Sequence, residues 1–332
     1  MDVDAVILWV DGSDPQWLAE KRKYSGETGD GSICRYRDWG LLRHWFRAME
    51  AFLPWLRQIH FVTWGHVPAF LNTAHPKLRI VRHDAFIPAQ YLPTFSSHTI
   101  ELNLHRIPGL AEHFIYFNDD MFPLRPMAAW DFFRDGLPCT CGSEVPWTVS
   151  GTVGIWEHAA INGLALVNRH FPKQAAVKQH RRKYVHSAYR WQDNLRTLAL
   201  ETLFPDRFTG FPNLHAPAAY CKSTFAAVWQ AEPALLDATC RHRLRSGSDV
   251  NQWVMLWWQV ASGHFAPRKI DNLVSDITNS AVTGLCDAIR QQSHAFICLN
   301  DPEEAVDFEA LGQQLRRAFD GILPERSAFE KS

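Results

Sequence analysis

Short runs of apolar residues, each followed by polar or turn-forming residues, recur in the first 120 positions of the chain. Runs of this length, rich in aliphatic and aromatic side chains, are typical of strands buried on both faces of a parallel sheet. They predict four strands, at residues 5–10, 59–63, 78–81 and 114–117, and a similar run predicts another at residues 296–299.

Between these runs the apolar positions recur at helical spacing. One helix is outlined by five apolar residues on a single face, Leu42, Trp45, Phe46, Met49 and Phe52. Further helices are predicted at residues 98–107, 251–260 and 308–319, whereas the alternation at residues 139–160 indicates a β-like edge or lid. The order β–α–β–β–α–β through residue 120 predicts an α/β fold, Rossmann-like, with a mostly parallel sheet flanked by helices. No GxGxxG or Walker A pattern is present, so neither a dinucleotide fingerprint nor a P-loop is predicted.

Polar residues follow two of the predicted strands. Asn118, Asp119 and Asp120 come directly after residues 114–117, and Asp11 and Gly12 follow the first strand. Open α/β sheets bind ligands at the carboxyl ends of their strands, and adjacent carboxylates there repel each other unless a cation joins them. Mg²⁺ suits oxygen ligands together with substrate phosphates. An Asx-rich turn that merely closes the strand fits these residues equally well.

Several charged side chains outside the strand ends also have two interpretations. Glu101 and His105 lie one helical turn apart, which favours a local ion pair for His105 and a substrate or supporting role for Glu101. Arg43 lies off the apolar stripe of its helix and could face solvent or a phosphate. His215 suits proton transfer and Arg245 suits bidentate phosphate binding, although each residue type is often purely structural.

Composition narrows the class of protein. The chain has 332 residues with a net charge of −1, so no general attraction to nucleic acid is expected. Seven irregularly spaced cysteines argue against a disulfide framework and for a reducing compartment. No run approaches the ~18 apolar residues of a spanning helix. We therefore expect a cytoplasmic protein, with peripheral association at the inner membrane as an open alternative.

Four long strings resemble one known family. They are AVILWVDGSDPQW (5–17), the stretch from RYRDWGLLRHWFRAME (35–50) to LPTFSSHTIELNLHRIPGLAEHFIYFNDDMF (92–122), His215 with RSGSD (245–249), and CLNDPEEAVDFEALGQQLRRAF (298–319). Together they resemble the Stealth family of sugar-1-phosphate transferases of microbial capsule synthesis. That family is similar to the catalytic part of the animal lysosomal-enzyme N-acetylglucosamine-1-phosphotransferase.

The resemblance implies a division of the chain and a set of site residues. Residues 1–157 would form the nucleotide-sugar-binding core, 158–214 a variable and mainly helical insertion, and 215–332 the remainder of the catalytic domain. Positions that match the functional residues of the family are Asp11, Asp38, Glu101, Asp120, His215 and Arg245. We expect nucleotide contacts from Asp11, Gly12, Arg37, Asp38, Arg43, Asn118 and Asp249, and metal ligation by Asp120, Asp119 and Asp11.

The resemblance also implies a reaction. Sugar 1-phosphate would pass from a nucleotide sugar, with a UDP-sugar expected, to a hydroxyl of a glycan acceptor, and a nucleoside monophosphate would leave. Mg²⁺, with Mn²⁺ as the alternative ion, would be held by Asp120, Arg245 would neutralise phosphate charge, and His215 would act as base. A phosphorylated His215 is the rival mechanism. Two other functions remain open, a metal-dependent glycosyltransferase that releases a nucleoside diphosphate and a non-catalytic glycan-binding module. The enzyme would serve capsular or exopolysaccharide synthesis, and peripheral association with a membrane capsule-assembly machinery is left open.

Overall fold

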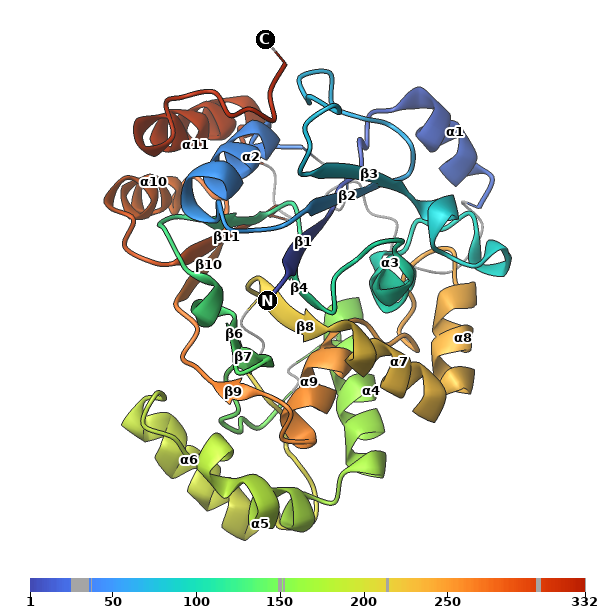
Figure 1. The fold of residues 1–332 in the computed structure, drawn as a ribbon, viewed down its shortest axis with the longest axis vertical. Coiled ribbons are helices and arrows are strands. Elements are labelled where there is room, and N and C mark those ends of the chain that lie inside the picture. The colour runs from blue at the N-terminus through green and yellow to red at the C-terminus, as the bar shows by residue number, and fades with distance from the viewer. Residues whose placement is uncertain are drawn as a thin grey trace.

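The predicted α/β architecture is confirmed by a computed structural model, which describes residues 1–24, 36, 38–148, 151, 153–212, 215–302 and 306–331. Within these residues the central sheet has five strands in the order β3-β2-β1-β4-β8 (Figure 1). Their bounds are β1 Val3–Leu8, β2 Ile59–Thr63, β3 Leu78–Arg82, β4 His113–Phe117 and β8 Ala218–Cys221. The first four run parallel, and β8 pairs antiparallel with β4 at the edge.

The strand order reverses at β1. The chain passes from β1 to β2 and β3 on one side, and β4 then returns to the other side of β1. Ile7 is paired with Phe61 on one side and with Phe117 on the other, so the segments that leave β1 and β4 emerge side by side. A reversal of this kind opens a crevice at the carboxyl ends of the strands.

Hydrophobic cores cover both faces of the sheet because alternate strand residues point to opposite sides. Ala5 and Ile7 face a core that includes Trp45 and Phe46 of α2 (Leu42–Phe52), whereas Val6 faces a second core. The first core also holds α10 (Val282–Gln291) and α11 (Phe308–Ile322). The second is built from α3 (Ser97–Leu102), α4 (Ile155–His170), α7 (Lys222–Ala231), α8 (Pro233–Arg241) and α9 (Trp253–Ala261).

A smaller sheet extends the site edge of the central one. It has the order β10-β11-β5, with β10 Asn272–Asp276, β11 Phe296–Asn300 and β5 Met121–Pro123. Because β5 starts one residue after Asp120, the chain that leaves β4 pairs at once with β11, and Leu299 N–H donates to Asp120 O at 3.0 Å. A third sheet, β6-β7-β9, contains Phe133–Arg134, Leu137–Thr140 and Ala266–Pro267.

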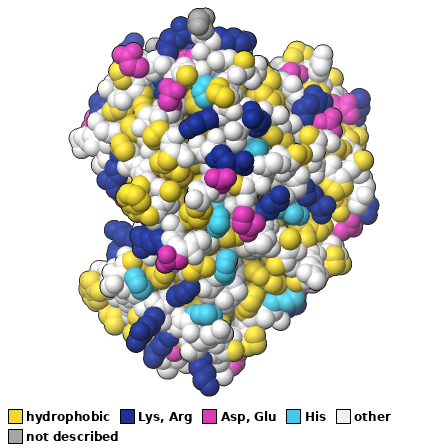
Figure 2. Space-filling model, viewed as in Figure 1, with side chains coloured by type: hydrophobic (Ala, Val, Ile, Leu, Met, Phe, Trp, Pro, Cys, Tyr) yellow, Lys and Arg dark blue, Asp and Glu magenta, His cyan; other side chains and the backbone are white. Residues whose placement is uncertain are grey.

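The remaining described helices are α1 (Pro15–Arg22), α5 (Lys173–Tyr184) and α6 (Trp191–Leu203), and α5 adds Ala176, Val177 and Tyr184 to the second core. Helices α5 and α6 lie side by side at the lower end of the view in Figure 1. In the described part of the chain, α4, α5 and α6 give the predicted insertion its helical character, while its boundaries stay a prediction. Basic and acidic side chains are interspersed on the face shown in Figure 2, in keeping with the net charge of −1. Among the described residues, no helix combines the length and apolar character that a membrane crossing requires.

Two local predictions were wrong. The helix predicted to reach residue 107 ends at Leu102, where Asn103 Nδ2 donates to Thr99 O at 2.8 Å and a 3₁₀ turn, Leu104–Arg106, follows. Residues 139–160 do not form a β edge beyond Thr140, because the next described residues, 141–148, are irregular and α4 starts at Ile155. The alternation reflects an extended segment in which Val145 N–H and Trp147 N–H donate to the carbonyls of Gly210 and Thr209.

Asp4 ties the sheet together at its amino-terminal edge. The fully buried carboxylate accepts hydrogen bonds from Arg57 Nε at 2.9 Å, His60 Nε2 at 3.0 Å and the backbone N–H of Ala111 at 2.8 Å. These donors belong to β2 and to the segments before β2 and β4. Burial acts to raise the pKa of Asp4, but the hydrogen bonds from His60, Arg57 and Ala111 outweigh it and lower the pKa below 3.8.

We predict that Asp4→Ala lowers the free energy of unfolding at pH 7 by about 3–5 kcal/mol, because removal of one partner leaves the others buried and unpaired. The folded-state pKa lies below the unfolded value, so this stabilisation is present above about pH 4 and is lost as pH falls below it. Urea denaturation at pH 7 and at pH 3 should show the gap between variant and wild type shrinking at the lower pH. The exposed Asp2→Ala is the control, and an equal loss in both variants would contradict the prediction.

Candidate active site

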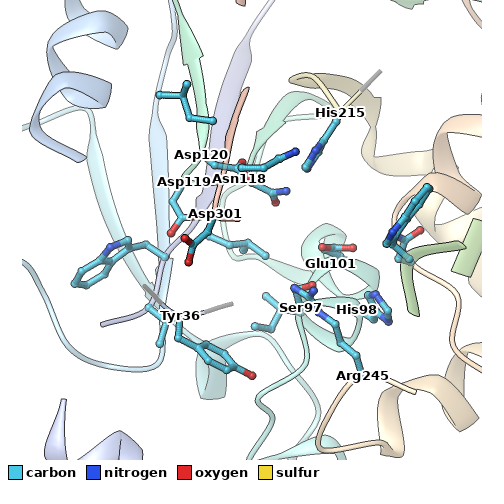
Figure 3. Close-up of a pocket in the computed structure, with 18 of the residues that line it drawn as sticks. Tyr36, Ser97, His98, Glu101, Asn118, Asp119, Asp120, His215, Arg245 and Asp301 are labelled. Carbon is cyan, nitrogen blue, oxygen red and sulfur yellow. The ribbon is translucent and has the colours of Figure 1, made fainter. Parts of the chain in front are cut away.

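A cavity of about 1040 Å³ opens at the carboxyl ends of β1 and β4, where the strand order reverses. Seven of the predicted site residues line it: Asp38, Glu101, Asn118, Asp119, Asp120, His215 and Arg245. They come from five separate stretches of the chain. Figure 3 shows the side chains of Asp119, Asp120 and Asp301 on one side of an open space and that of Arg245 on the other.

The first side of the cavity is a group of carboxylates. Asp119 and Asp120 follow β4, and Asp301 follows β11, which the pairing of β11 with β5 brings alongside. Burial raises the pKa of Asp120. The pKa of Asp119 is raised to about 8, first by burial of the carboxyl group and then by repulsion from Asp120 and Asp38. Solvent in the cavity nevertheless reaches the Asp119 side chain. A cation bound beside these acids would favour their charged forms.

His215 lies against the same acids. Its backbone has a positive φ of 37°, and Asn272 Nδ2 donates to its carbonyl oxygen at 2.9 Å. Ligand atoms of Asp120, His215 and Cys298 all lie within 4.8 Å of one another, and Nδ1 of His215 is 3.7 Å from Sγ of Cys298. Burial and then the charge of Asp120 raise the pKa of the Cys298 thiol well above its usual range, so this thiol keeps its proton.

Arg245 is positioned by a loop that Asp249 closes. The Asp249 carboxylate is fully buried and accepts hydrogen bonds from the backbone N–H of Ser246 at 2.8 Å and from Nδ1 of His98 and His242 at 3.0 and 2.6 Å. Asp249 itself does not line the cavity, whereas His98 does. The predicted nucleotide contact of Asp249 is therefore not supported by its placement; its contacts indicate a role in holding the Arg245 loop.

Glu101 faces the cavity from α3. Its carboxylate accepts hydrogen bonds from the hydroxyl of Tyr116 at 3.2 Å and from the backbone N–H of Gln252 at 3.3 Å. Tyr116 also reaches Asn118 Oδ1 at 2.5 Å, which links Glu101 to the end of β4. The ion pair predicted between Glu101 and His105 was wrong, because α3 ends between them and the His105 ring lies near Phe225. Burial lowers the pKa of His105 to about 4, so this side chain is neutral at pH 7.

Besides Asp249, three predicted residues that the structure describes do not line the cavity: Asp11, Gly12 and Arg43. The carboxylate of Asp11 accepts hydrogen bonds from the N–H and hydroxyl of Ser13, as in an Asx turn, yet its charge is near enough to help raise the pKa of Asp38, after burial. A side chain at Gly12 would overlap the backbone of Tyr36, so the two segments of the chain come close together at this glycine. Arg43 pairs with Glu330 at 3.6 Å and lies over Phe70, so a phosphate contact is not supported. Arg37 lies outside the described residues.

Sequence reasoning did not assign two residues that line the site. Asp301 follows β11 just as Asp119 follows β4, so the strand-end signal that identified the first acids was present at residues 300–301 as well. His98 carried no such signal, because its buried partner Asp249 lies 151 positions later in the chain.

Comparisons with known proteins identify the family to which these segments belong. Models of two domains, described as Stealth protein conserved region 1 and conserved region 2, match residues 1–29 and 35–139. A capsular polysaccharide phosphotransferase WcwK of Streptococcus pneumoniae is 36% identical over 99% of this chain and 99% of its own length. The chain belongs to the Stealth family.

Other Stealth relatives match from end to end. The exopolysaccharide phosphotransferase cps2G of Lactiplantibacillus plantarum is 34% identical over 99% of this chain and 96% of its own. The receptor polysaccharide phosphotransferase WefC of Streptococcus gordonii is 35% identical over 99% of this chain and 98% of its own. This Stealth chain is accordingly a transferase. The galactosyltransferase LgtC, solved with donor and acceptor sugar analogues, aligns over 98% of both chains at 10% identity with a TM-score of 0.39, which supports no functional conclusion.

We predict that Asp119 makes the metal-free protein less stable as pH rises. A carboxyl whose folded pKa is about 8 holds its proton more tightly when folded, so the free energy of unfolding falls between about pH 4 and pH 8. In EDTA, the thermal midpoint of Asp119→Asn should decline less steeply from pH 5 to pH 8 than that of the wild type. Asp206→Asn, at an exposed position outside the cavity, is the control. Equal slopes for Asp119→Asn and the wild type would refute the assignment.

Proposed function

We propose that this protein transfers sugar 1-phosphate from a nucleotide sugar to a hydroxyl of a glycan acceptor, in capsular or exopolysaccharide synthesis. The observation that carries the proposal is the meeting, in one cavity, of the Asp119–Asp120 pair with His215 and Arg245 from far along the chain. Phosphoryl-type transfer requires charge neutralisation and positioning more than covalent chemistry from the protein, and these residue types supply both. The names of the full-length relatives support the same reaction class.

The carboxylate side of the cavity suits a divalent cation. Asp120 Oδ1 is buried and has no hydrogen-bond partner among the described residues, and Asp119 and Asp301 add further oxygens nearby. Mg²⁺, or Mn²⁺, prefers such oxygens, whereas the protonated thiol of Cys298 is a poor ligand for either. The residues that would hold the ion are therefore Asp119, Asp120 and Asp301 rather than Asp11. When bound, the cation would offset the negative charge of the donor diphosphate.

The residues of the chain then have distinct roles in the transfer. Nδ1 or Nε2 of His215 takes the proton of the acceptor hydroxyl as its oxygen bonds to the phosphorus next to the sugar. The bond from that phosphorus to the oxygen shared with the nucleotide phosphate breaks, and the electron pair leaves with the nucleoside monophosphate. Arg245 stabilises the negative charge on the transferred phosphate through bidentate hydrogen bonds. Glu101, held by Tyr116 and Gln252, lies where it can accept a sugar hydroxyl.

We propose that the donor nucleotide binds at the β1 side of the cavity. Trp9 follows β1, and Trp17 lies with its ring centroid 4.8 Å from that of Tyr36 and 5.7 Å from that of Phe95. All four line the cavity, and the Tyr36 ring lies on the side of Asp119 and Asp301 in Figure 3. A nucleobase can stack on the open face of an aromatic ring, and the switch point of the sheet is the usual place for a nucleotide. We propose a UDP-sugar as donor; association with a membrane assembly machinery stays a prediction.

Identification of the released nucleotide tests the proposal. Wild-type protein, Mg²⁺, a panel of nucleotide sugars and a glycan acceptor should yield nucleoside monophosphate, and EDTA should stop the reaction. Asp120→Asn should abolish both turnover and Mn²⁺ binding measured by electron paramagnetic resonance, with an unchanged circular dichroism spectrum, while Asp206→Asn should retain both. Release of nucleoside diphosphate would instead identify a glycosyltransferase, and normal turnover by Asp120→Asn would exclude the metal role.

A second prediction concerns His215. Because loss of a general base typically costs at least about 100-fold in rate, His215→Ala should lower kcat by this amount or more while leaving donor binding within about twofold. The rate and the donor Kd can be measured separately by single-turnover assay and calorimetry. His170→Ala, which removes an imidazole paired with Glu232 outside the cavity, is the matched control. A loss below about tenfold would assign the base role to another residue, with His98 as the next candidate.

A further inference from the structure

A second aromatic wall lies across the cavity from the proposed nucleotide wall. Trp156 and Trp253 line the cavity from the first turns of α4 and α9. These helices pack against each other, and α9 contacts β8, on the far side of β4 from β1. The acids that follow β4 therefore lie between two groups of aromatic residues, one carried by β1 and its neighbours and one by α4 and α9.

Trp156 is exposed although it is held in place. Its side chain is 48% exposed, while its ring centroid lies 6.0 Å from that of Trp147 at an interplanar angle of 66°. Trp147 in turn contacts Trp253 and Trp257, and its Nε1 donates to the carbonyl of Phe211 at 2.9 Å. An ordered aromatic surface that remains open to a cavity loses little conformational entropy when a ligand covers it.

The aromatic wall is also tied to the catalytic loop. Asn162 of α4 donates to the carbonyls of Gly247 and Asp249 at 3.0 and 2.9 Å, and those residues follow Arg245 directly. These hydrogen bonds fix the middle of α4, about two turns after Trp156, against the loop that carries Arg245. A ligand that rests on Trp156 would have its position fixed relative to the guanidinium that binds the transferred phosphate.

Polar groups complete the chemistry of this wall. Asn251 and Gln252 immediately precede Trp253 and line the cavity, and Glu101 accepts the backbone N–H of Gln252. A pyranose ring presents a flat C–H face and a rim of hydroxyls, which match an open indole face beside amide and carboxylate groups. A nucleobase has the same flatness but is expected at the β1 wall, and a lipid would leave the polar groups without partners.

We propose that Trp156 and Trp253 form a stacking subsite for a pyranose ring of the acceptor glycan. Glu101 and Asn251 would bind its hydroxyls, and the acceptor hydroxyl would extend from this subsite toward His215 and Arg245. The subsite gives the enzyme a way to select a sugar acceptor over water. This assignment rests on the proposed transfer of sugar phosphate, but its test measures binding and needs no turnover.

The test is a titration with methyl glycosides of glucose, galactose and N-acetylglucosamine in the presence of Mg²⁺ and UMP, followed by saturation-transfer NMR. At least one glycoside should bind the wild type, and Trp156→Ala should weaken that binding about tenfold, as expected for loss of an aromatic contact worth about 1.4 kcal/mol. Trp156→Phe should retain most of the affinity. Trp191→Ala is the matched control, because Trp191 is exposed on α6 outside the cavity.

The competing outcomes are distinct. The Kd of UMP, measured by calorimetry, should be the same for Trp156→Ala and the wild type; a selective loss of UMP affinity would assign the wall to the nucleotide and overturn the proposal. Unchanged glycoside binding by Trp156→Ala, or no binding of any glycoside by the wild type, would also overturn it. If instead the wild type releases no nucleoside monophosphate while the glycoside results hold, the transfer reaction fails and the sugar site stands.

Discussion

Repulsion among carboxylates at the meeting point of two sheets is the constraint on which the site depends. Asp119 and Asp120 end β4, and the immediate start of β5 forces the chain to pair with β11, which delivers Asp301 to the same place. Burial raises the pKa values of Asp119 and Asp120, and repulsion from Asp120 and Asp38 adds to the rise at Asp119, so the charged forms of these acids are disfavoured in the folded protein. A divalent cation held by these acids would favour their charged forms, and this supports our proposal that the donor diphosphate binds at this point.

The rest of the fold supplies what the acids lack. The reversal of strand order at β1 opens the crevice, and the loop closed by Asp249 delivers Arg245 as the positive charge opposite the acids. His215, with a positive φ, is held by Asn272 of β10, so the small sheet positions both Asp301 and the proposed base, His215. In the proposed arrangement, the donor and the acceptor bind at separate aromatic walls and so do not compete for one surface.

Much of this arrangement could be predicted from local patterns. The strands at 59–63 and 114–117 and the amphipathic helix at 42–52 match the structure because burial on a sheet face dictates their periodicity. The acids at residues 119 and 120 followed from their place after a buried strand. His215 and Arg245 were candidates because of their side-chain chemistry alone, and the family resemblance then favoured a functional role over a structural one.

What sequence reasoning missed depends on contacts between distant segments. The hydrogen bond from His98 to Asp249 and the pair between Arg43 and Glu330 join residues far apart in the chain, so no spacing rule could reveal them. Asp301 had the right local signal, but its proximity to Asp120 depends on the pairing of β11 with β5. The alternation at 139–160 led to a wrong prediction of a β edge. An extended segment can form backbone hydrogen bonds with a loop, as residues 145 and 147 do, without joining a sheet.

The central claim is that the bond broken lies between the two phosphates of the donor and not between the sugar and its phosphate. A UDP-sugar labelled with ¹⁸O at the oxygen that bridges sugar C1 and phosphorus tests this directly. Our account predicts that ³¹P NMR will find the label retained in the phosphodiester product, with unlabelled UMP released. Appearance of the label in released UDP, with a product that contains no phosphorus, would contradict the account and identify glycosyl transfer.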